Sequence, residues 1–439
     1  MIKEKILLIF DKLNLLITKV AAYFNYPFIC YLSILISLKR HNFFTKRKKK
    51  NILVLYRSLG IFDLEKFNDI NQSHSLFILP RFHLKIIFHI FFKDLNHSIN
   101  DNDYLTKNIH IENKKKFYRD FLSKVLFYLN KKFNFSSILS FNFRYYAERE
   151  LHFAAKNNKI KFVCLHKESL VFPGEIEPYY ELLKSYGKYG GDYILFYNND
   201  LKNILSKTLV ASPKNLKVIG MPRADYYFRK KIKPKSKKFI LIFLINPKRM
   251  IHIMKKKYLK NLKVDLKQLN WSQLSYNLID NVLKFAKKNP EVEFIFKTKK
   301  LFMKDVNLNQ KSQESMVCNA KLKNCKLAFG GDSRQLIEKS KCVIGFNSTT
   351  LIESLILKKP IIVPTFGIKK IILKNFTLNL KNSAFYAKNQ KELNKVLNDV
   401  VTGKINRTKA GKKVLRNIIT KYLGNNDGRS SKRLINYLI

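Results

Sequence analysis

The stretch CVIGFNSTTLIESLILKKPIIVP, residues 342–364, decides the fold prediction. An apolar run ends at Gly345, a segment with helical periodicity begins near Thr349, and a second apolar run follows Pro360. Strand, helix and strand in this order are typical of a parallel sheet covered by helices. Small hydroxyl and amide side chains stand between the first strand and the helix. At that point free backbone N–H groups can hold an anion.

The same alternation runs through the rest of the chain in two halves. In the first half we predict strands at 51–56, 75–80, 136–142, 161–169, 192–198 and 217–220, and helices at 144–158 and from about residue 200. In the second half we predict further strands at 239–246 and 293–297, and helices at 271–289, from Asp332 to about 340, at 390–402 and at 408–423. The sequence therefore predicts an α/β protein with two Rossmann-like, doubly wound domains facing a cleft.

Composition changes mark the domain boundaries. Residues 229–238, RKKIKPKSKK, are seven-tenths basic and include a proline, so we predict an exposed linker. We assign 51–228 to the N-terminal Rossmann-like domain and 239–439 to the C-terminal one, with closing helices. Residues 1–50 form a helical prefix.

Lysine dominates the charge of this chain. Its 439 residues carry 85 Lys and Arg against 31 Asp and Glu, a formal net charge of +54. Such a field attracts nucleic acid, anionic lipid headgroups or nucleotide diphosphates. A genome rich in A and T also favours Lys and Asn codons, so the charge alone does not indicate a nucleic-acid protein. The five scattered cysteines suit a reducing cytoplasm rather than a disulfide framework or a zinc site.

The prefix leaves three alternatives open. Residues 20–38 carry no charge and are long enough to span a bilayer. Pro27 and several polar residues within them weaken that interpretation, and the basic run 46–50 follows. The segment could therefore span a membrane, lie on an anionic membrane surface, or form an ordinary buried helical prefix. The segment contains no evident small-residue cleavage site, so we do not expect a removed signal peptide.

The quoted stretch carries the strongest candidate binding site. Asn347, Ser348, Thr349 and Thr350 surround the expected helix start, where N–H groups and the helix dipole favour a phosphate. Glu353, one turn further on, could accept hydrogen bonds from ribose hydroxyls. The alternative is an ordinary Ser or Thr N-cap followed by a first-turn glutamate.

Single residues after other strands extend this list. Lys297 ends a strand at the sheet edge where open α/β sheets bind ligands, and Arg223 lies in the turn GMPRAD, residues 220–225. His166 follows a buried strand and is the candidate general base, with Glu168 to orient it. Each has a structural alternative: a solvated lysine, an Arg–Asp pair, or a packed histidine.

Together these residues resemble surface-polysaccharide transferases, namely capsule and lipopolysaccharide glycosyltransferases of the GT-B fold and the related CDP-glycerol glycerophosphotransferases. The resemblance rests on His166, GMPRAD at 220–225, FIFKTKK at 294–300, the stretch 345–364 and DGRSSKR at 427–433. It covers about residues 51–439.

This resemblance implies an enzyme that moves a sugar from a nucleotide-activated donor to a cell-envelope polysaccharide or lipid-linked acceptor. Domain 239–439 would hold the donor and domain 51–228 the acceptor, with His166 as base. No metal or other cofactor is expected, since no Asp-x-Asp cluster suited to a magnesium ion bridging a diphosphate appears. The glycerophosphotransferases carry Lys-x-His-Pro where this chain has Lys297-Thr298-Lys299-Lys300, and this difference favours sugar transfer.

Rival functions remain. A UDP-sugar epimerase shares the double architecture and needs no acceptor, and a glycerophosphotransferase is a further enzyme alternative. A basic nucleic-acid binder or an inactive scaffold are the non-enzyme alternatives; the sequence shows no recognition-helix signature, and we expect no nucleic-acid partner. The expected location is the cytoplasm, at the inner face of the cell membrane.

Overall fold

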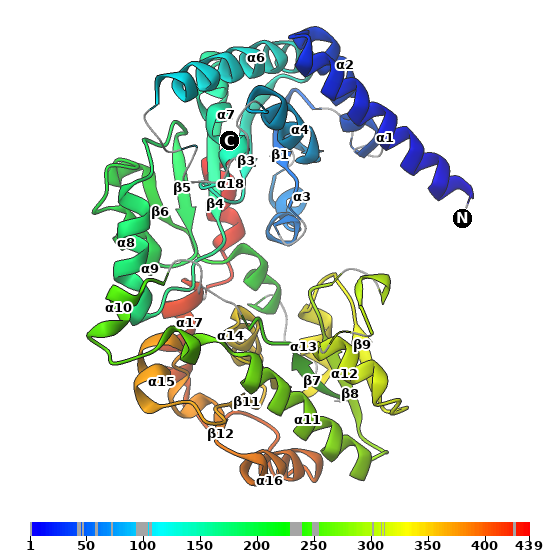
Figure 1. Ribbon diagram of the computed structural model, residues 1–439, viewed down its shortest axis with the longest axis vertical. Coiled ribbons are helices and arrows are strands. Elements are labelled where there is room, and N and C mark those ends of the chain that lie inside the picture. Colours follow the sequence, from blue (N-terminus) through cyan, green and yellow to red (C-terminus); the bar gives the residue numbers. More distant parts are fainter. Residues whose placement is uncertain are drawn as a thin grey trace. The chain divides into compact units, whose positions relative to one another are not determined.

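The computed structural model describes residues 2–41, 45, 48–57, 60–71, 73–93, 104, 108–228, 239–247, 254–300, 303–308, 310, 312–424 and 427–439. The chain forms two compact units, each with its own sheet (Figure 1). Unit 1 contains Met1–Ser169, Leu183–Arg223 and Arg429–Ile439, and unit 2 contains Leu170–Leu182 and Ala224–Gly428.

The helices and strands follow the predicted alternation. From the N-terminus to the first sheet's last strand they are α1 (Ile2–Tyr23), α2 (Pro27–His41), β1 (Lys50–Leu55), α3 (Phe67–Ile70), β2 (His74–Leu79), α4 (Phe82–Phe91), α6 (Ile109–Phe133), β3 (Phe135–Ser140), α7 (Tyr146–Asn157), β4 (Lys161–His166), α8 (Ile176–Lys184), β5 (Tyr193–Phe196), α9 (Asn199–Leu205) and β6 (Leu216–Val218). The remaining ones are β7 (Phe239–Phe243), α10 (Lys256–Lys260), α11 (Ser272–Lys288), β8 (Glu293–Lys297), α12 (Gln313–Asn319), β9 (Cys325–Ala328), α13 (Arg334–Lys339), β10 (Ser340–Ile344), α14 (Thr349–Ile356), β11 (Ile361–Pro364), α15 (Lys370–Phe376), β12 (Phe385–Ala387), α16 (Gln390–Val401), α17 (Lys412–Leu423) and α18 (Ser430–Leu438).

Both sheets are parallel and six-stranded. The sheet of unit 1 has the order β2-β1-β3-β4-β5-β6, which is the flavodoxin-like order extended by one strand. The sheet of unit 2 has the order β12-β11-β10-β7-β8-β9, which is the Rossmann order of two βαβαβ halves. The predicted α/β class with two Rossmann-like, doubly wound units is therefore confirmed. The cleft stays a prediction.

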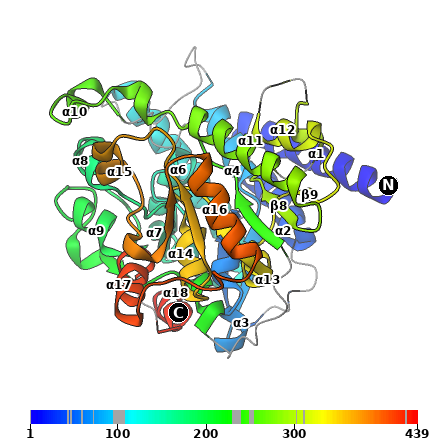
Figure 2. The ribbon, with the colours of Figure 1, turned by 90° about the horizontal axis from the view of Figure 1, so that it is seen from below.

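Buried strands hold each unit together. All five residues of β7 and the last five of β1 are buried, as expected when helices cover both faces of a parallel sheet. In unit 2, α16 packs on β10, β11 and β12 (Figure 2). The short strands β9 and β12 escaped the sequence prediction, because they are three or four residues long and less completely buried.

The uncharged run 20–38 is not one helix. α1 ends at Tyr23, the chain turns through Asn25 with a left-handed φ of 56°, and α2 begins at Pro27. Proline suits the first turn of a helix, where its missing N–H would have no partner. No helix in the described part of the chain combines the length and the apolarity needed to cross a bilayer.

Two segments belong to a different unit from the one that the predicted domain boundaries suggest. The terminal helix α18 belongs to unit 1, where Ser137 donates a hydrogen bond to the Leu438 carbonyl at 2.8 Å and Arg433 donates to the Ile219 carbonyl at 2.7 Å. Residues 170–182 belong to unit 2. The predicted linker 229–238 lies outside the described residues.

Candidate functional site

Topology places one candidate site in unit 2 at the carboxyl ends of β7 and β10. The chain runs outward from these neighbouring strands in opposite directions along the sheet, so their loops diverge. Ligands of open α/β sheets bind at such switch points. The loop after β10 is residues 345–348, in the middle of the stretch that decided the fold prediction.

Ser348 starts the helix at this switch point. It is the N-cap of α14, and its Oγ accepts a hydrogen bond from the Thr350 N–H at 3.3 Å. The Ser348 and Thr350 hydroxyls also lie 2.8 Å apart. Ser348, Thr349 and Thr350 are all half-buried, neither sealed in the core nor fully exposed. The Ser348 Oγ and carbonyl accept the N–H groups of Thr350 and Leu351, so three partly exposed hydroxyl residues surround a capped helix start.

Asn347 fixes the loop before the helix. Its backbone is left-handed, with φ at 49°. Its amide donates to the Phe376 carbonyl at 2.9 Å and accepts from the Leu378 N–H at 2.9 Å. Both ends of the side chain therefore bind the backbone after α15, and Asn347 positions the helix start.

Glu353 and Lys297 are more buried than the sequence suggested. Glu353 is 2% exposed and accepts a hydrogen bond from the Tyr227 hydroxyl at 3.2 Å. Lys297 is 8% exposed, donates to the carbonyls of Thr298 and Gly330, and has a pKa lowered by burial. Since β7 separates β8 from β10, Lys297 lies about 10 Å of sheet width away from the strand that leads to Ser348.

Unit 1 has its own switch point, between β1 and β3. Arg57 follows β1, Asn142 follows β3, and Glu168 follows β4. The Arg57 guanidinium forms an ion pair with Glu168 at 2.9 Å, and the Asn142 amide donates to the same carboxylate at 3.3 Å. Burial raises the pKa of Glu168, but the Arg57 guanidinium opposes it, and that pKa lies below its ordinary value.

Lys167 lies beside this ion pair. Burial lowers the pKa of its amine to about 7; the Asp63 carboxylate raises that pKa, while Arg57 and Arg223 lower it. The Lys167 Nζ is buried without a hydrogen-bond partner and lies 6.0 Å from the centre of the Phe141 ring. One Arg57 nitrogen, Nη1, is likewise buried and without a partner. Two basic side chains with unused donors, at the carboxyl ends of β1 and β4 in the same sheet, are suited to binding an anion.

Asp63 connects this cluster to the turn GMPRAD. Its carboxylate accepts hydrogen bonds from the backbone N–H of Arg223 at 3.1 Å and from the Tyr197 hydroxyl at 2.8 Å. Asp63 is 2% exposed. It therefore holds the turn at Arg223 against the strand ends of unit 1.

His166 is in the interior of unit 1. Its side chain is 1% exposed, and its ring lies 4.8 Å from that of Phe143 and 6.1 Å from that of Phe196. Burial lowers the pKa of the imidazole to about 3, so it is neutral at physiological pH. Its Nδ1 is buried without a hydrogen-bond partner.

The structure thus collects the predicted residues in two groups, one in each unit. His166, Glu168 and Arg223 belong to unit 1, and the other six belong to unit 2. Sequence reasoning did not select Arg57, Lys167, Asp63 and Asn142. Arg57 directly follows a predicted strand, and Asn142 and Lys167 lie near the carboxyl ends of predicted strands, as His166 does, so strand-end position was the signal that could have found them.

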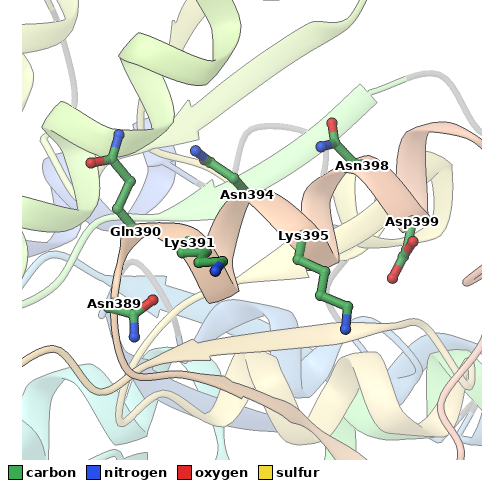
Figure 3. Close-up of a pocket in the computed structure, with 7 residues that line it drawn as sticks. All are labelled: Asn389, Gln390, Lys391, Asn394, Lys395, Asn398 and Asp399. Atoms are coloured by element: carbon green, nitrogen blue, oxygen red, sulfur yellow. The ribbon is translucent and has the colours of Figure 1, made fainter.

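One hollow in unit 2 lies away from these residues. It measures about 810 Å³ and is lined by Asn389, Gln390, Lys391, Asn394, Lys395, Asn398 and Asp399 (Figure 3). All seven belong to one helix, α16, and its N-cap, so a single helix face forms the hollow without an opposing wall. We assign no site there. Among the described residues, no group of three His, Cys, Asp or Glu side chains has a metal-binding arrangement.

Comparison with known proteins gives structural similarity only. No protein-family model matches the chain, and no curated protein matches it. Solved structures that are similar include a UDP-GlcNAc 2-epimerase from Neisseria meningitidis bound to UDP-GlcNAc, with a TM-score of 0.47, 11% identity, and coverage of 89% of this chain and 99% of that one. A glycosyltransferase from Rickettsia africae has a TM-score of 0.44 at 15% identity, covering 89% and 98%. At TM-scores and identities this low, the similarities establish neither a substrate nor a reaction.

Proposed function

We propose that this protein is a glycosyltransferase that moves a sugar from a nucleotide-activated donor to a cell-envelope polysaccharide or lipid-linked acceptor, at the inner face of a membrane. The observation that carries the proposal is the start of α14. The half-exposed hydroxyls of Ser348, Thr349 and Thr350 gather there, at the switch point of a Rossmann-ordered sheet. These hydroxyls, at the positive end of the α14 dipole, suit the diphosphate of a nucleotide donor.

In this proposal the donor diphosphate binds at Ser348, Thr349 and Thr350. Negative charge develops on the leaving diphosphate during transfer, and the positive end of the helix dipole stabilises it. Asn347 and Glu353 act as positioning residues, because hydrogen bonds to the 376–378 backbone and to Tyr227 already engage them. Lys297 likewise holds the Gly330 turn.

The acceptor side is unit 1. Arg57 supplies an unused, buried donor for an anionic group of the acceptor. An amine with a pKa of about 7 is matched to proton abstraction at neutral pH, so Lys167 is our first candidate for the general base. His166, with a pKa of about 3, is the second candidate.

The donor site is tested by charge reversal at a helix cap. Ser348→Asp keeps a good N-cap and favours the helix dipole, so the fold is expected to stay intact. Its carboxylate repels a diphosphate. In a thermal-shift screen with UDP-, GDP-, CMP- and CDP-linked sugars, we expect one donor class to raise the melting temperature of the wild type by several degrees. In Ser348→Asp we expect that donor to bind at least tenfold more weakly.

A matched control is Asn389→Asp, which changes the N-cap of α16 in the same unit and by the same charge. It should bind the donor like the wild type. Equal donor affinity in Ser348→Asp and the wild type would refute the diphosphate site.

The base is tested by nucleotide release in the presence of total membrane lipid. Lys167→Met should lose at least 100-fold in kcat, whereas the exposed control Lys188→Met should not. Loss of turnover in His166→Leu but not in Lys167→Met would assign the base to the imidazole instead. Conversion of the donor without any acceptor would favour the epimerase alternative.

A further inference from the structure

The first two helices expose an unusual amount of apolar surface. Eleven large apolar side chains of α1, α2 and their turn are more than a third exposed: Leu13, Leu16, Ile17, Val20, Tyr23, Phe24, Tyr26, Phe28, Ile29, Leu32 and Ile36. Scattered exposed apolar residues need no explanation, but a concentration of this kind marks an interaction surface. We call it the prefix face.

The prefix face follows helical geometry. On α1, Leu13, Leu16 and Val20 recur at three- and four-residue spacing, so they share one side of the helix, and Phe24 follows directly after its end. Lys12 and Lys19 are seven residues apart, which is about two helical turns, so they lie on the same side of the helix, along one edge of this apolar stripe. An apolar stripe with lysines along its edge is typical of helices that lie in a membrane interface.

Polar bonds hold the opposite side of these helices in the body of unit 1. The Thr18 hydroxyl lies 2.7 Å from that of Ser33 on α2 and 2.9 Å from Nδ1 of His83 on α4. The Ser33 hydroxyl donates to the Asn14 side chain at 2.7 Å. All four residues are buried. The two helices are thus anchored on their inner side, and the prefix face is their outer side.

Aromatic rings concentrate at the turn between the helices. Tyr23, Phe24, Tyr26 and Phe28 are each more than half exposed. The rings of Phe24 and Tyr26 are stacked with centroids 6.3 Å apart. Aromatic side chains are favoured at the boundary between lipid and water, because their rings are apolar and polarisable. We call these four residues the aromatic tip.

A basic groove adjoins the aromatic tip. It measures about 760 Å³, and Tyr23 contributes to its lining together with Phe117. Three ammonium groups also line it, from Lys93, Lys114 and Lys124, against a single carboxylate, that of Asp120. The Lys93 Nζ lies 4.0 Å from the centre of the Tyr23 ring. Positive charge therefore lies directly beside the exposed aromatic rings.

We propose that the prefix face docks on the surface of an anionic lipid bilayer, with the aromatic tip inserted among the acyl chains and the groove lysines at the headgroups. Charge complementarity selects this occupant. The first 50 residues carry eleven Lys and Arg against two Asp and Glu, so anionic headgroups complement the face whereas a second copy of it would repel it. The proposal is independent of the reaction proposed above.

Vesicle co-sedimentation of the full chain tests this surface. The wild type should bind vesicles with 30% phosphatidylglycerol at least tenfold more tightly than pure phosphatidylcholine vesicles, and salt should weaken the binding. The double variant Phe24→Ser, Phe28→Ser should weaken vesicle binding at least tenfold, because two apolar rings that would be buried among the acyl chains are removed. Lys93→Gln with Lys124→Gln should weaken it by about fivefold per lysine, on anionic vesicles only.

The matched control is Leu209→Ser, which removes a side chain of unit 1 that is 95% exposed and should bind like the wild type. Circular dichroism and donor thermal shifts of the tip variant verify its fold. A wild type that does not sediment with either vesicle would overturn the proposal. So would a dimer in sedimentation equilibrium that the tip variant dissociates.

Discussion

The buried imidazole of His166 makes a prediction about acid stability. An ordinary histidine has a pKa of about 6.5, and burial lowers that of His166 to about 3. Below pH 6.5 the unfolded chain binds a proton there that the folded chain does not. The free energy of unfolding therefore falls as the pH decreases from 6.5 towards 3, and this stability is fully present above pH 6.5.

The size of the effect follows from the two pKa values. Between pH 8 and pH 5, proton linkage at this one group costs about 2 kcal/mol, and the limit below pH 3 is about 5 kcal/mol. His166→Leu keeps an apolar side chain of similar size between Phe143 and Phe196. It removes the linkage whatever its effect on stability at pH 8.

Urea unfolding of both proteins at pH 8 and pH 5 measures this difference. Far-UV circular dichroism follows both units, and fluorescence of Trp271, the single tryptophan, follows unit 2. We expect the stability gap between variant and wild type to shift by about 2 kcal/mol in favour of the variant at pH 5. His110→Leu, which replaces an exposed imidazole, should show no such shift. A gap that is equal at both pH values would refute the buried, neutral imidazole.

Three further substitutions test packing and loop geometry. Asn347→Ala should lower the free energy of unfolding by about 2–3 kcal/mol in urea denaturation, since two hydrogen bonds and an asparagine suited to left-handed backbone are lost; an Asn347→Gly variant as unstable as the alanine variant would contradict the backbone part. A Cβ at Gly174 would overlap with the Phe376 ring, so Gly174→Ala should lower the melting temperature and cost about 1–3 kcal/mol. Thr18→Val should lower the free energy of unfolding by a similar amount, because it removes the hydroxyl that contacts Ser33 and His83. Relative to the wild type, amide hydrogen exchange should become faster in α1 but not in α7.

The sequence predicted some residues of the candidate sites better than others. Ser348 was predictable because a small polar residue between a buried strand and an apolar helix is an N-cap by local chemistry alone, and the structure places it there. The roles of Lys297 and Glu353 were not predictable in the same way. Their carbonyl and hydroxyl partners, at Gly330 and Tyr227, are 33 and 126 residues away in the chain. No local pattern identifies such partners.

By itself, the sequence determined the alternation of buried strands and helices, because period and apolar run length are local properties that each segment carries. This was enough for the α/β class and for most strand positions in both halves. Only the tertiary structure decided the strand orders, and hence which loops diverge at a switch point. It also decided that α18 returns to unit 1, that Lys167 lies beside Arg57 and Asp63, and that His166 is enclosed by aromatic rings. These features depend on contacts between residues far apart in the chain, whose free energies become defined only when the whole unit packs.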